Sequence, residues 1–253
     1  MANLQQITPE ERDRQLQVIA TPDKGLVGVA SSRSMNWHYE LLPPQTKKAL
    51  DFLSAEAWLA ESKWYQAGGT ALALQAGTRK SYDLNIFTSE SEFNGEMLLA
   101  NFLMTPDWRT EWVKKNTIYG ELFGSKISFL ANPLFLPGRE PIRHGALSVL
   151  SALDIAVMKI IAISQRGRKR DFYDLYWCAR NLEGLTDLIL RLPAQYPSVA
   201  HNYHHILKSM VYFQDVDSDP DPVIYYQASW EGIRSFFQKE IPQIARTLII
   251  QDG

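Results

Sequence analysis

Residues 64–88 read WYQAGGTALALQAGTRKSYDLNIFT, and the prediction of the fold rests mainly on this stretch. A short run at residues 64–67 favours a strand, and two glycines follow it as a tight exit. Residues 71–76 are strong helix formers. Residues 83–88 then alternate polar and apolar side chains in the manner of a half-buried strand. The stretch therefore predicts a strand, a glycine turn, a helix and a second strand in succession.

The glycine turn has the composition of a phosphate-binding site. Gly68 and Gly69 let a ligand approach the backbone closely, and the following helix would point its free N–H groups and positive dipole end at that ligand. Thr70 would add a hydroxyl donor. Taken alone, however, a Gly-Gly-Thr sequence is more often an ordinary turn than a phosphate site.

Asp83 and Asn85 sharpen this interpretation. Residues i and i+2 of a strand face the same side, so both side chains would project toward whatever the glycine turn holds. Two carboxylates in such a place would hold one or two Mg²⁺ ions against a triphosphate. The second position here carries an amide, which can offer a carbonyl oxygen but no charge.

Length and composition limit the class of protein. The chain has 253 residues, 45% of them hydrophobic, and its 26 Lys and Arg nearly balance 28 Asp and Glu. That length predicts roughly one or two domains with a substantial core, and the composition excludes an intrinsically disordered chain. The net charge of −2 argues against nucleic-acid binding by bulk electrostatics, although a local basic patch stays open.

The remaining chain-wide signals predict a cytoplasmic protein that does not associate with membranes. The single cysteine, Cys178, excludes an internal disulfide, fits a reducing compartment and is expected to be a small buried side chain. The N-terminus lacks the basic and apolar regions of a signal peptide. No apolar run approaches the roughly 20 residues that a membrane helix needs.

Composition also divides the chain. Residues 1–36 are polar and poorly periodic, and we expect an N-terminal extension of uncertain order there. Residues 132–145 contain three prolines and two glycines, which suggests a linker or lid. Elsewhere the periodicity predicts a helix over residues 91–104, strands near residues 108–117 and 126–131, and helices from Ser151 onward.

Three ordered motifs carry a resemblance to a known family. They are Gly68-Gly69-Thr70 followed by Arg79-x-Ser81-x-Asp83-Leu-Asn85, then Ser151-Ala-Leu-Asp154 through Lys159, then Arg166-Gly-Arg-Lys-Arg170-Asp171-Phe-Tyr-Asp174-Leu. In these motifs the chain, from about residue 37 to 245, resembles the AbiEii-type nucleotidyltransferase-like proteins. That family includes toxins of type IV toxin–antitoxin systems.

The resemblance implies an α+β protein. A polymerase-beta-like nucleotidyltransferase palm, which is a small mixed sheet with flanking helices, would span residues 37–140. A helical C-terminal region packed on the palm would span residues 141–253. The implied activity is nucleotide transfer, supported by Mg²⁺, from an NTP to tRNA or another acceptor, and a cognate antitoxin is a further implied partner.

The resemblance also assigns roles to individual residues. Asp83 would bind metal with Asn85 in the second ligand position, and Lys159 would meet the triphosphate. Asp171 or Asp174 would orient that lysine or act as a base. The residues implied to bind the nucleotide are Gly68, Gly69, Thr70, Arg79 and Ser81.

The chain departs from the family's motif at the second acidic position. The family has Asp-x-Asp or Asp-x-Glu where this chain has Asn85, and the later strand offers Ser128 where related polymerases often carry a third carboxylate. One hypothesis is therefore a Mg²⁺-dependent nucleotidyltransferase with Asp83 as its principal metal ligand. Another is a catalytically degenerate relative that binds a nucleotide or a partner, and a third is a protein that acts through its helical half alone.

Simpler explanations compete for several of these residues. Lys159 lies in an otherwise apolar helix and would extend to solvent at a domain edge, while Asp171 would cap a helix. The basic run at residues 166–170 would be a solvated loop, with contact to RNA or a triphosphate as the alternative.

Two further groups of side chains favour ordinary packing. The histidines of residues 201–205 have a spacing that could suit a metal, but they lack the glutamate of a zinc-protease helix. Tyr225, Tyr226 and Trp230 could stack on bases, although core packing is the favoured explanation.

Overall fold

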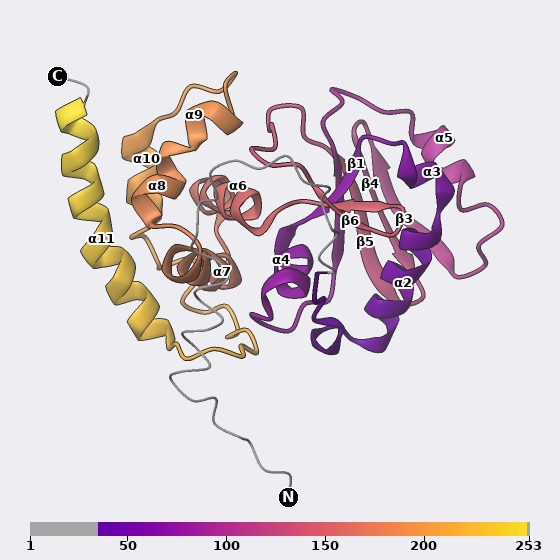
Figure 1. The fold of residues 1–253 in the computed structure, drawn as a ribbon, viewed down its shortest axis with the longest axis horizontal. Coiled ribbons are helices and arrows are strands. Elements are labelled where there is room, and N and C mark those ends of the chain that lie inside the picture. Colours follow the sequence, from indigo (N-terminus) through magenta and orange to yellow (C-terminus); the bar gives the residue numbers. More distant parts are fainter. Residues whose placement is uncertain (1–34, 252–253) are drawn as a thin grey trace, which may run out of the picture. The chain divides into compact units, whose positions relative to one another are not determined.

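The structure, a computed structural model, describes residues 35–251, which form a seven-stranded mixed sheet with helices on both of its faces (Figure 1). Strands and helices alternate over the first part of the chain and helices follow, so the predicted α+β class is confirmed. Apart from residues 35 and 36, the extension expected over residues 1–36 lies outside the described residues.

The sheet combines parallel and antiparallel pairs. Its strands are β1 Trp64–Ala67, β2 Leu84–Thr88, β3 Trp108–Lys114, β4 Thr117–Leu122, β5 Ser125–Ala131, β6 Ile142–His144 and β7 Leu147–Val149. They lie in the order β3-β4-β5-β2-β1-β7-β6. β1 pairs antiparallel with β2 and parallel with β7, and β2 pairs parallel with β5. The remaining neighbours pair antiparallel.

The helices group on the two sides of this sheet. They are α2 Pro44–Ala55, α3 Ala57–Ala60, α4 Gly68–Ala76, α5 Gly95–Ala100, α6 Ala152–Arg166, α7 Lys169–Asn181, α8 Leu185–Leu190, α9 Leu192–Gln195, α10 Tyr203–Ser209 and α11 Trp230–Gln251, with the 3₁₀ helix η1 at Tyr39–Leu41. In Figure 1, α2, α3 and α5 lie toward one face, and α4 separates the other face from α6 and α7.

Alternation along β2 assigns its side chains to two hydrophobic cores. Leu84 and Ile86 are fully buried in the core that α2, α3 and α5 share with the sheet. Phe87 faces the opposite side and packs on the larger core of α4, α6, α7 and α11. Asn85 shares the face of Phe87. Cys178 is buried in the larger core, as predicted.

Some predicted elements have different bounds. The helix expected over residues 91–104 begins only at Gly95, because the Asn94 side chain accepts a hydrogen bond from the Met97 N–H and caps the helix there. The strand expected to reach residue 117 stops at Lys114, since Asn116 adopts a φ of +62° and turns the chain into β4. The linker expected over residues 132–145 includes β6.

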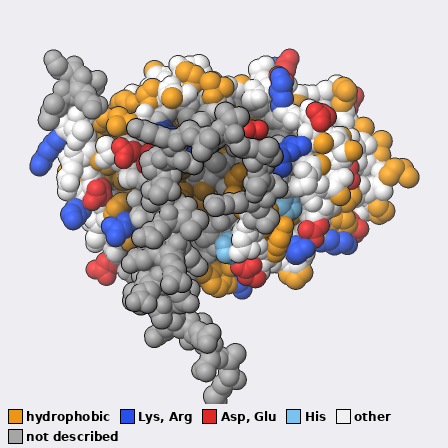
Figure 2. All heavy atoms as spheres, in the orientation of Figure 1, with side chains coloured by type: hydrophobic (Ala, Val, Ile, Leu, Met, Phe, Trp, Pro, Cys, Tyr) orange, Lys and Arg blue, Asp and Glu red, His pale blue; other side chains and the backbone are white. Residues whose placement is uncertain are grey.

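Charge and hydropathy agree with the sequence-based expectations. On the face drawn in Figure 2, the visible basic side chains lie among acidic ones, in line with the net charge of −2. Among the helices that the structure describes, none is long and apolar enough to cross a bilayer.

Candidate active site

The glycine turn leads directly from β1 into α4, because Gly68 and Gly69 are the first two residues of that helix and not a separate turn before it. Gly68 has a φ of +76°, and a Cβ at this position would lie 3.2 Å from Asn85 Nδ2. α4 begins directly at the turn, and within the described residues no side chain caps its first turn. The leading N–H groups of α4 therefore remain available to an anion.

Arg79 lies against the second glycine of the turn. Its guanidinium is so close to Gly69 that a Cβ there would collide with Nη2. Nε and Nη2 donate hydrogen bonds to the two oxygens of Asp174 at 2.7 and 2.9 Å, and Nη1 donates to the Lys80 carbonyl at 3.0 Å. The turn is thus flanked by the Asn85 amide on one side and by a guanidinium on the other.

Thr70 and Ser81 fasten the connection between α4 and β2. The buried Thr70 hydroxyl donates to the Asp83 carbonyl oxygen at 2.6 Å and lies 2.7 Å from Ser81 Oγ. Because a hydroxyl has one proton, Ser81 must be the donor to Thr70. The structure therefore commits both hydroxyl protons to hydrogen bonds within the protein.

Arg79 belongs to a buried cluster of four charges that also contains Lys159, Asp171 and Asp174. Lys159 Nζ lies 2.6 Å from Asp171 Oδ1 and 2.7 Å from Asp174 Oδ2. The four side chains expose only 1% to 12% of their surface. Two cations and two anions balance, so this charge cluster ties the segment before β2 to α6 and α7 with no net charge.

The pairs hold their members in the charged state. Burial alone would raise the pKa of Asp174, but the charges of Arg79 and Lys159 outweigh burial and lower that pKa below its ordinary value. Burial alone would lower the pKa of Lys159, yet Asp171 and Asp174 raise it. Removing one partner of such a pair typically costs about 3–5 kcal/mol of stability.

The simpler explanations offered for this region are only partly correct. Lys159 does not extend to solvent, because its ammonium is buried between two carboxylates. Asp171 does cap α7, accepting a hydrogen bond from the Arg168 N–H at 3.2 Å, and it also binds Lys159. The basic run is not simply a solvated loop, since Arg168 pairs with Asp219 at 3.0 Å and Lys169 is buried.

Asp83 and Asn85 differ in what surrounds them. Asp83 is partly exposed, and in the part of the chain that the structure describes its carboxylate has no hydrogen-bond or ion-pair partner. Asn85 Oδ1 accepts a hydrogen bond from Ser128 Oγ at 2.9 Å, because the parallel register of β2 and β5 places these two residues opposite each other. The described residues contain no group of three or more His, Cys, Asp or Glu able to hold a metal ion.

This donor set fits a Mg²⁺ ion that arrives with a triphosphate. Mg²⁺ in nucleotide sites commonly takes one or two carboxylates and completes its shell with water and substrate phosphates. Asp83 would supply the carboxylate, and Asn85 the amide oxygen that Ser128 now binds. A site for two ions would need further acids, which neither Asn85 nor Ser128 provides.

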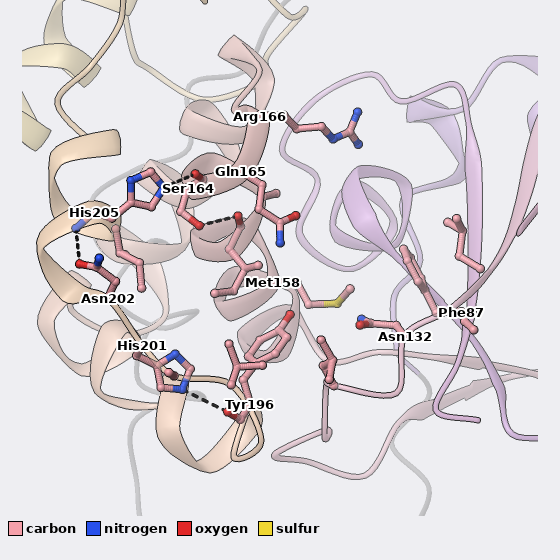
Figure 3. A pocket seen from close by; sticks show the side chains of 18 residues that line it. Phe87, Asn132, Met158, Ser164, Gln165, Arg166, Tyr196, His201, Asn202 and His205 are labelled. Carbon is pink, nitrogen blue, oxygen red and sulfur yellow. Dashed lines mark hydrogen bonds between the residues drawn. The ribbon is translucent and has the colours of Figure 1, made fainter. Parts of the chain in front are cut away.

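A cavity of about 430 Å³ lies further along the same face of the sheet, and its lining does not include Asp83, Asn85 or Ser128 (Figure 3). Phe87 and Leu130 line it, and they lie two residues beyond Asn85 and Ser128 on the same strand faces, roughly 7 Å further along. The labelled side chains that enclose the cavity from the helices include Met158, Gln165, Tyr196 and His205 (Figure 3).

The histidines near the cavity are bound to backbone carbonyls. The His205 ring donates to the Ser164 carbonyl at 2.8 Å, and the His201 ring donates to the Tyr196 carbonyl at 3.1 Å. These contacts agree with packed or surface histidines rather than with a metal site.

A contact from the C-terminal half was not predicted. Residues 223–225 pair with residues 78–80: the Lys80 N–H donates to the Val223 carbonyl and the Tyr225 N–H donates to the Thr78 carbonyl, both at 2.9 Å. This pairing fixes the backbone of Arg79. The sequence signal around residues 215–222, with its prolines and aspartates, indicates only a break in the chain.

Comparisons with known proteins identify the family of the chain. A family model described as "Nucleotidyl transferase AbiEii toxin, Type IV TA system" matches residues 140–247. An uncharacterized protein of Aquifex aeolicus (strain VF5), aq_aa25, is 32% identical over 189 residues, which cover 71% of this chain and 87% of that protein.

One solved structure supports the fold. The nucleotidyltransferase toxin MenT4 of Mycobacterium tuberculosis H37Rv has a TM-score of 0.53 and 14% sequence identity to this chain, over 78% of this chain and 82% of that one. The fold is therefore that of nucleotidyltransferases, as the family resemblance implied.

Proposed function

Because the chain belongs to the AbiEii nucleotidyltransferase family of type IV toxin–antitoxin systems, we propose that it transfers a nucleotide from a Mg²⁺-bound NTP to an RNA acceptor such as tRNA. The observation that carries this proposal is the start of α4, where Gly68 lies against Asn85 and Gly69 against Arg79. Asp83 lies two residues before Asn85, and its carboxylate has no partner among the residues that the structure describes. The acceptor hydroxyl would attack the α-phosphate, and pyrophosphate would leave.

The phosphates would bind at the start of α4. Its leading N–H groups and positive dipole end favour an anion, and the guanidinium of Arg79, whose charge Asp174 balances, lies beside Gly69 and would add a further N–H donor. Gly68 has no Cβ, which lets the Asn85 amide lie against the same turn. These groups are fixed by the fold and would orient the triphosphate before any transfer.

Asp83 would hold the metal. When bound, Mg²⁺ would supply positive charge that offsets the charge developing on the phosphates. The Thr70 and Ser81 hydrogen bonds fix the backbone of Asp83, so the position of this carboxylate is set by α4.

The other three members of the charge cluster, Lys159, Asp171 and Asp174, would position Arg79 and would not contact the reacting atoms. Asp174 holds the guanidinium through two hydrogen bonds, and Lys159 with Asp171 holds Asp174 in turn. Since both Asp174 oxygens are bound to cations and its pKa is lowered, a role as proton acceptor is disfavoured. Lys159 and Asp171 are positioning residues in this proposal.

The cavity would receive the nucleoside. It begins two residues beyond Asn85 and Ser128 and is lined by Phe87, an aromatic side chain able to contact a base, and by the amides of Asn132 and Gln165. Amide groups can both donate and accept hydrogen bonds, which suits the edge of a nucleobase.

A specific observation favours a second candidate function. Asn85 brings no charge and its oxygen is bound to Ser128, so the protein could bind a nucleotide or a partner without transferring anything. As a toxin of this family, the chain would be restrained by a cognate antitoxin, and the predicted cytoplasmic location suits both candidates.

Label transfer separates the two candidates. The full chain is incubated with each labelled NTP, Mg²⁺ or Mn²⁺, and total tRNA, beside Asp83→Ala and Asn85→Asp variants. The proposal expects transfer by the wild type that falls at least about 100-fold in Asp83→Ala, because a metal contributes several kcal/mol. Label transfer by Asn85→Asp but not by the wild type would identify a degenerate protein. Equal label transfer by the wild type and Asp83→Ala would contradict the proposed metal site.

A further inference from the structure

The residue pairs of the sheet align a row of side chains that starts at the candidate active site. Asn85 lies opposite Ser128, Ser128 opposite Tyr119, and Tyr119 opposite Trp112. Residues directly opposite each other in neighbouring strands share one face of the sheet. Strands lie about 4.8 Å apart, so Tyr119 is about 10 Å and Trp112 about 14 Å from Asn85 along the row.

A β-bulge brings Trp112 onto this face. Trp108 lies opposite Leu122 and belongs to the core on the other side of the sheet. In an uninterrupted strand, residues four apart share a face, so Trp112 would point to that core as well. The register shift between Thr110 and Trp112 inserts an extra residue, Glu111, and turns Trp112 to the side of Tyr119.

The two aromatic side chains are exposed. Trp112 and Tyr119 expose 47% and 42% of their surface, and their ring centroids lie 5.5 Å apart with planes inclined by 30°. Ile118, the neighbour of Tyr119 that faces the other side, is fully buried. The bulge therefore turns Trp112 away from the hydrophobic core and places it against Tyr119 at the surface. Core packing does not explain why two large aromatic side chains are exposed there.

Basic side chains flank this aromatic pair on the same face. Lys126 lies two residues before Ser128 on β5, and Lys114 lies two residues after Trp112 on β3. Both lysines are exposed, and neither forms an ion pair with any residue that the structure describes. Aromatic rings with unpaired cations beside them suit a chain that carries bases and phosphates.

We infer that Trp112 and Tyr119 form a stacking platform for the single-stranded end of the RNA acceptor, with Lys114 and Lys126 contacting its phosphates. This inference rests on the proposed function, because we assign the platform to the RNA acceptor on the basis of its alignment with Asn85 in the proposed active site. The cavity beyond Phe87 lies further along the strands, whereas the row runs across them, so the nucleotide and the acceptor would approach from different directions. A protein partner on the same surface is the competing occupant.

Binding of a labelled single-stranded oligoribonucleotide to the full chain tests the platform. Fluorescence anisotropy is measured for the wild type, for Trp112→Ala and Tyr119→Ala, and for Trp112→Phe as a conservative variant. Tyr212→Ala is the matched control, because Tyr212 is 48% exposed and lies after α10, outside the row. Each platform alanine variant should weaken binding about 5- to 150-fold, since stacking contributes that much per base. Trp112→Phe should recover most of the loss.

A second measurement on the same proteins separates this inference from the proposed function. NTP binding with Mg²⁺ should be equal in the wild type and in the platform variants, and equal unfolding transitions should show that they fold. RNA affinity that is unchanged in both alanine variants, or wild-type protein that does not bind the oligoribonucleotide, overturns the platform. If the wild type transfers label to RNA while the platform variants bind RNA normally, the proposed function stands and the platform is wrong. If the platform variants lose RNA binding but the wild type binds no NTP, the proposed function is wrong, while the role of Trp112 and Tyr119 in RNA binding stands.

Discussion

At Asn85, the amide presents two different groups to its neighbours. Its oxygen accepts the Ser128 hydrogen bond, and its nitrogen lies beside Gly68, so an N–H donor faces the glycine turn. An N–H group suits a phosphate oxygen, whereas a carboxylate at the same position would suit a metal ion. Relative to the family's motif, Asn85 would thus change the site from two acids to one acid and an additional phosphate donor, and Asp83 would be left as the carboxylate for the metal.

Gly69→Ala tests whether the guanidinium beside the turn binds phosphate. The added Cβ would collide with Arg79 Nη2, so the guanidinium must move away from the start of α4. Loss of a hydrogen bond to a charged group costs about 1.5–3 kcal/mol, and we expect NTP affinity to fall about 10- to 150-fold by calorimetry. Gly95→Ala is the control, because a Cβ there meets its nearest atom at an ordinary 3.4 Å. Equal NTP affinity in both variants would contradict a phosphate role for Arg79.

Asp174→Asn tests the charge cluster. The amide would leave Arg79 and Lys159 without a shared counter-charge in a buried place, and stability should fall by about 3–5 kcal/mol in denaturant unfolding. Glu183→Gln breaks the more exposed pair with Arg191 and should cost no more than about 1 kcal/mol. A similar small loss in both variants would show that the cluster contributes little.

Helix α4 positions β2, the strand that follows it, through the Thr70 side chain. Thr70→Val removes the hydroxyl that binds the Asp83 carbonyl and Ser81, leaving buried polar groups unsatisfied at a cost of about 1–3 kcal/mol. Transfer activity should fall with stability, because the Asp83 backbone loses its anchor. Thr70→Ser keeps the hydroxyl and should retain most of both. Full transfer activity of Thr70→Val, under conditions where this variant is folded, would show that the Thr70 hydrogen bond is not needed to position Asp83.

The sequence predicts elements well where its pattern is local. The strand, glycine turn, helix and strand of residues 64–88 follow from propensity, glycine and alternation, and the structure confirms them as β1, α4 and β2. The hairpin of β3 and β4 is missed because its two-residue turn, Lys115 and Asn116, contains neither glycine nor proline. β6 and β7, three residues each, are too short to show a period.

The candidate site was only partly predictable for the same reason. The family resemblance implied Asp83, Lys159, Asp171 and Asp174, and the structure brings the last three into one buried cluster with Arg79. The partner of Arg79 lies 95 residues away, and no pattern in one sequence reports such a contact. The aromatic pair of Trp112 and Tyr119 depends on a bulge, which alternation cannot predict.

The charge cluster makes the free energy of unfolding of the whole protein depend on pH. Folding lowers the pKa of Asp174, so its contribution is complete above the ordinary value of 3.8 and is lost as the pH falls through the lower folded pKa. Folding raises the pKa of Lys159, so its contribution is complete below 10.5 and is lost as the pH rises through the higher folded pKa.

The stability difference between wild type and Asp174→Asn should therefore be largest and nearly constant between about pH 5 and 9, and should shrink in acid. Denaturant unfolding at a series of pH values measures this difference. A difference that grows as the pH falls below 3.8 would contradict the assigned ion pairs.

In the proposed function, Asp83 alone supplies the carboxylate for a metal–nucleotide complex. Titration of the full chain with Mn²⁺, followed by the EPR signal of the free ion with and without a nonhydrolysable NTP analogue, tests it most directly. We predict that the wild type binds one Mn²⁺ in the presence of the nucleotide, that Asp83→Asn weakens this binding about 10-fold or more, and that Asn85→Asp tightens it. Equal Mn²⁺ affinity in the wild type and Asp83→Asn, with the nucleotide present, would contradict the claim.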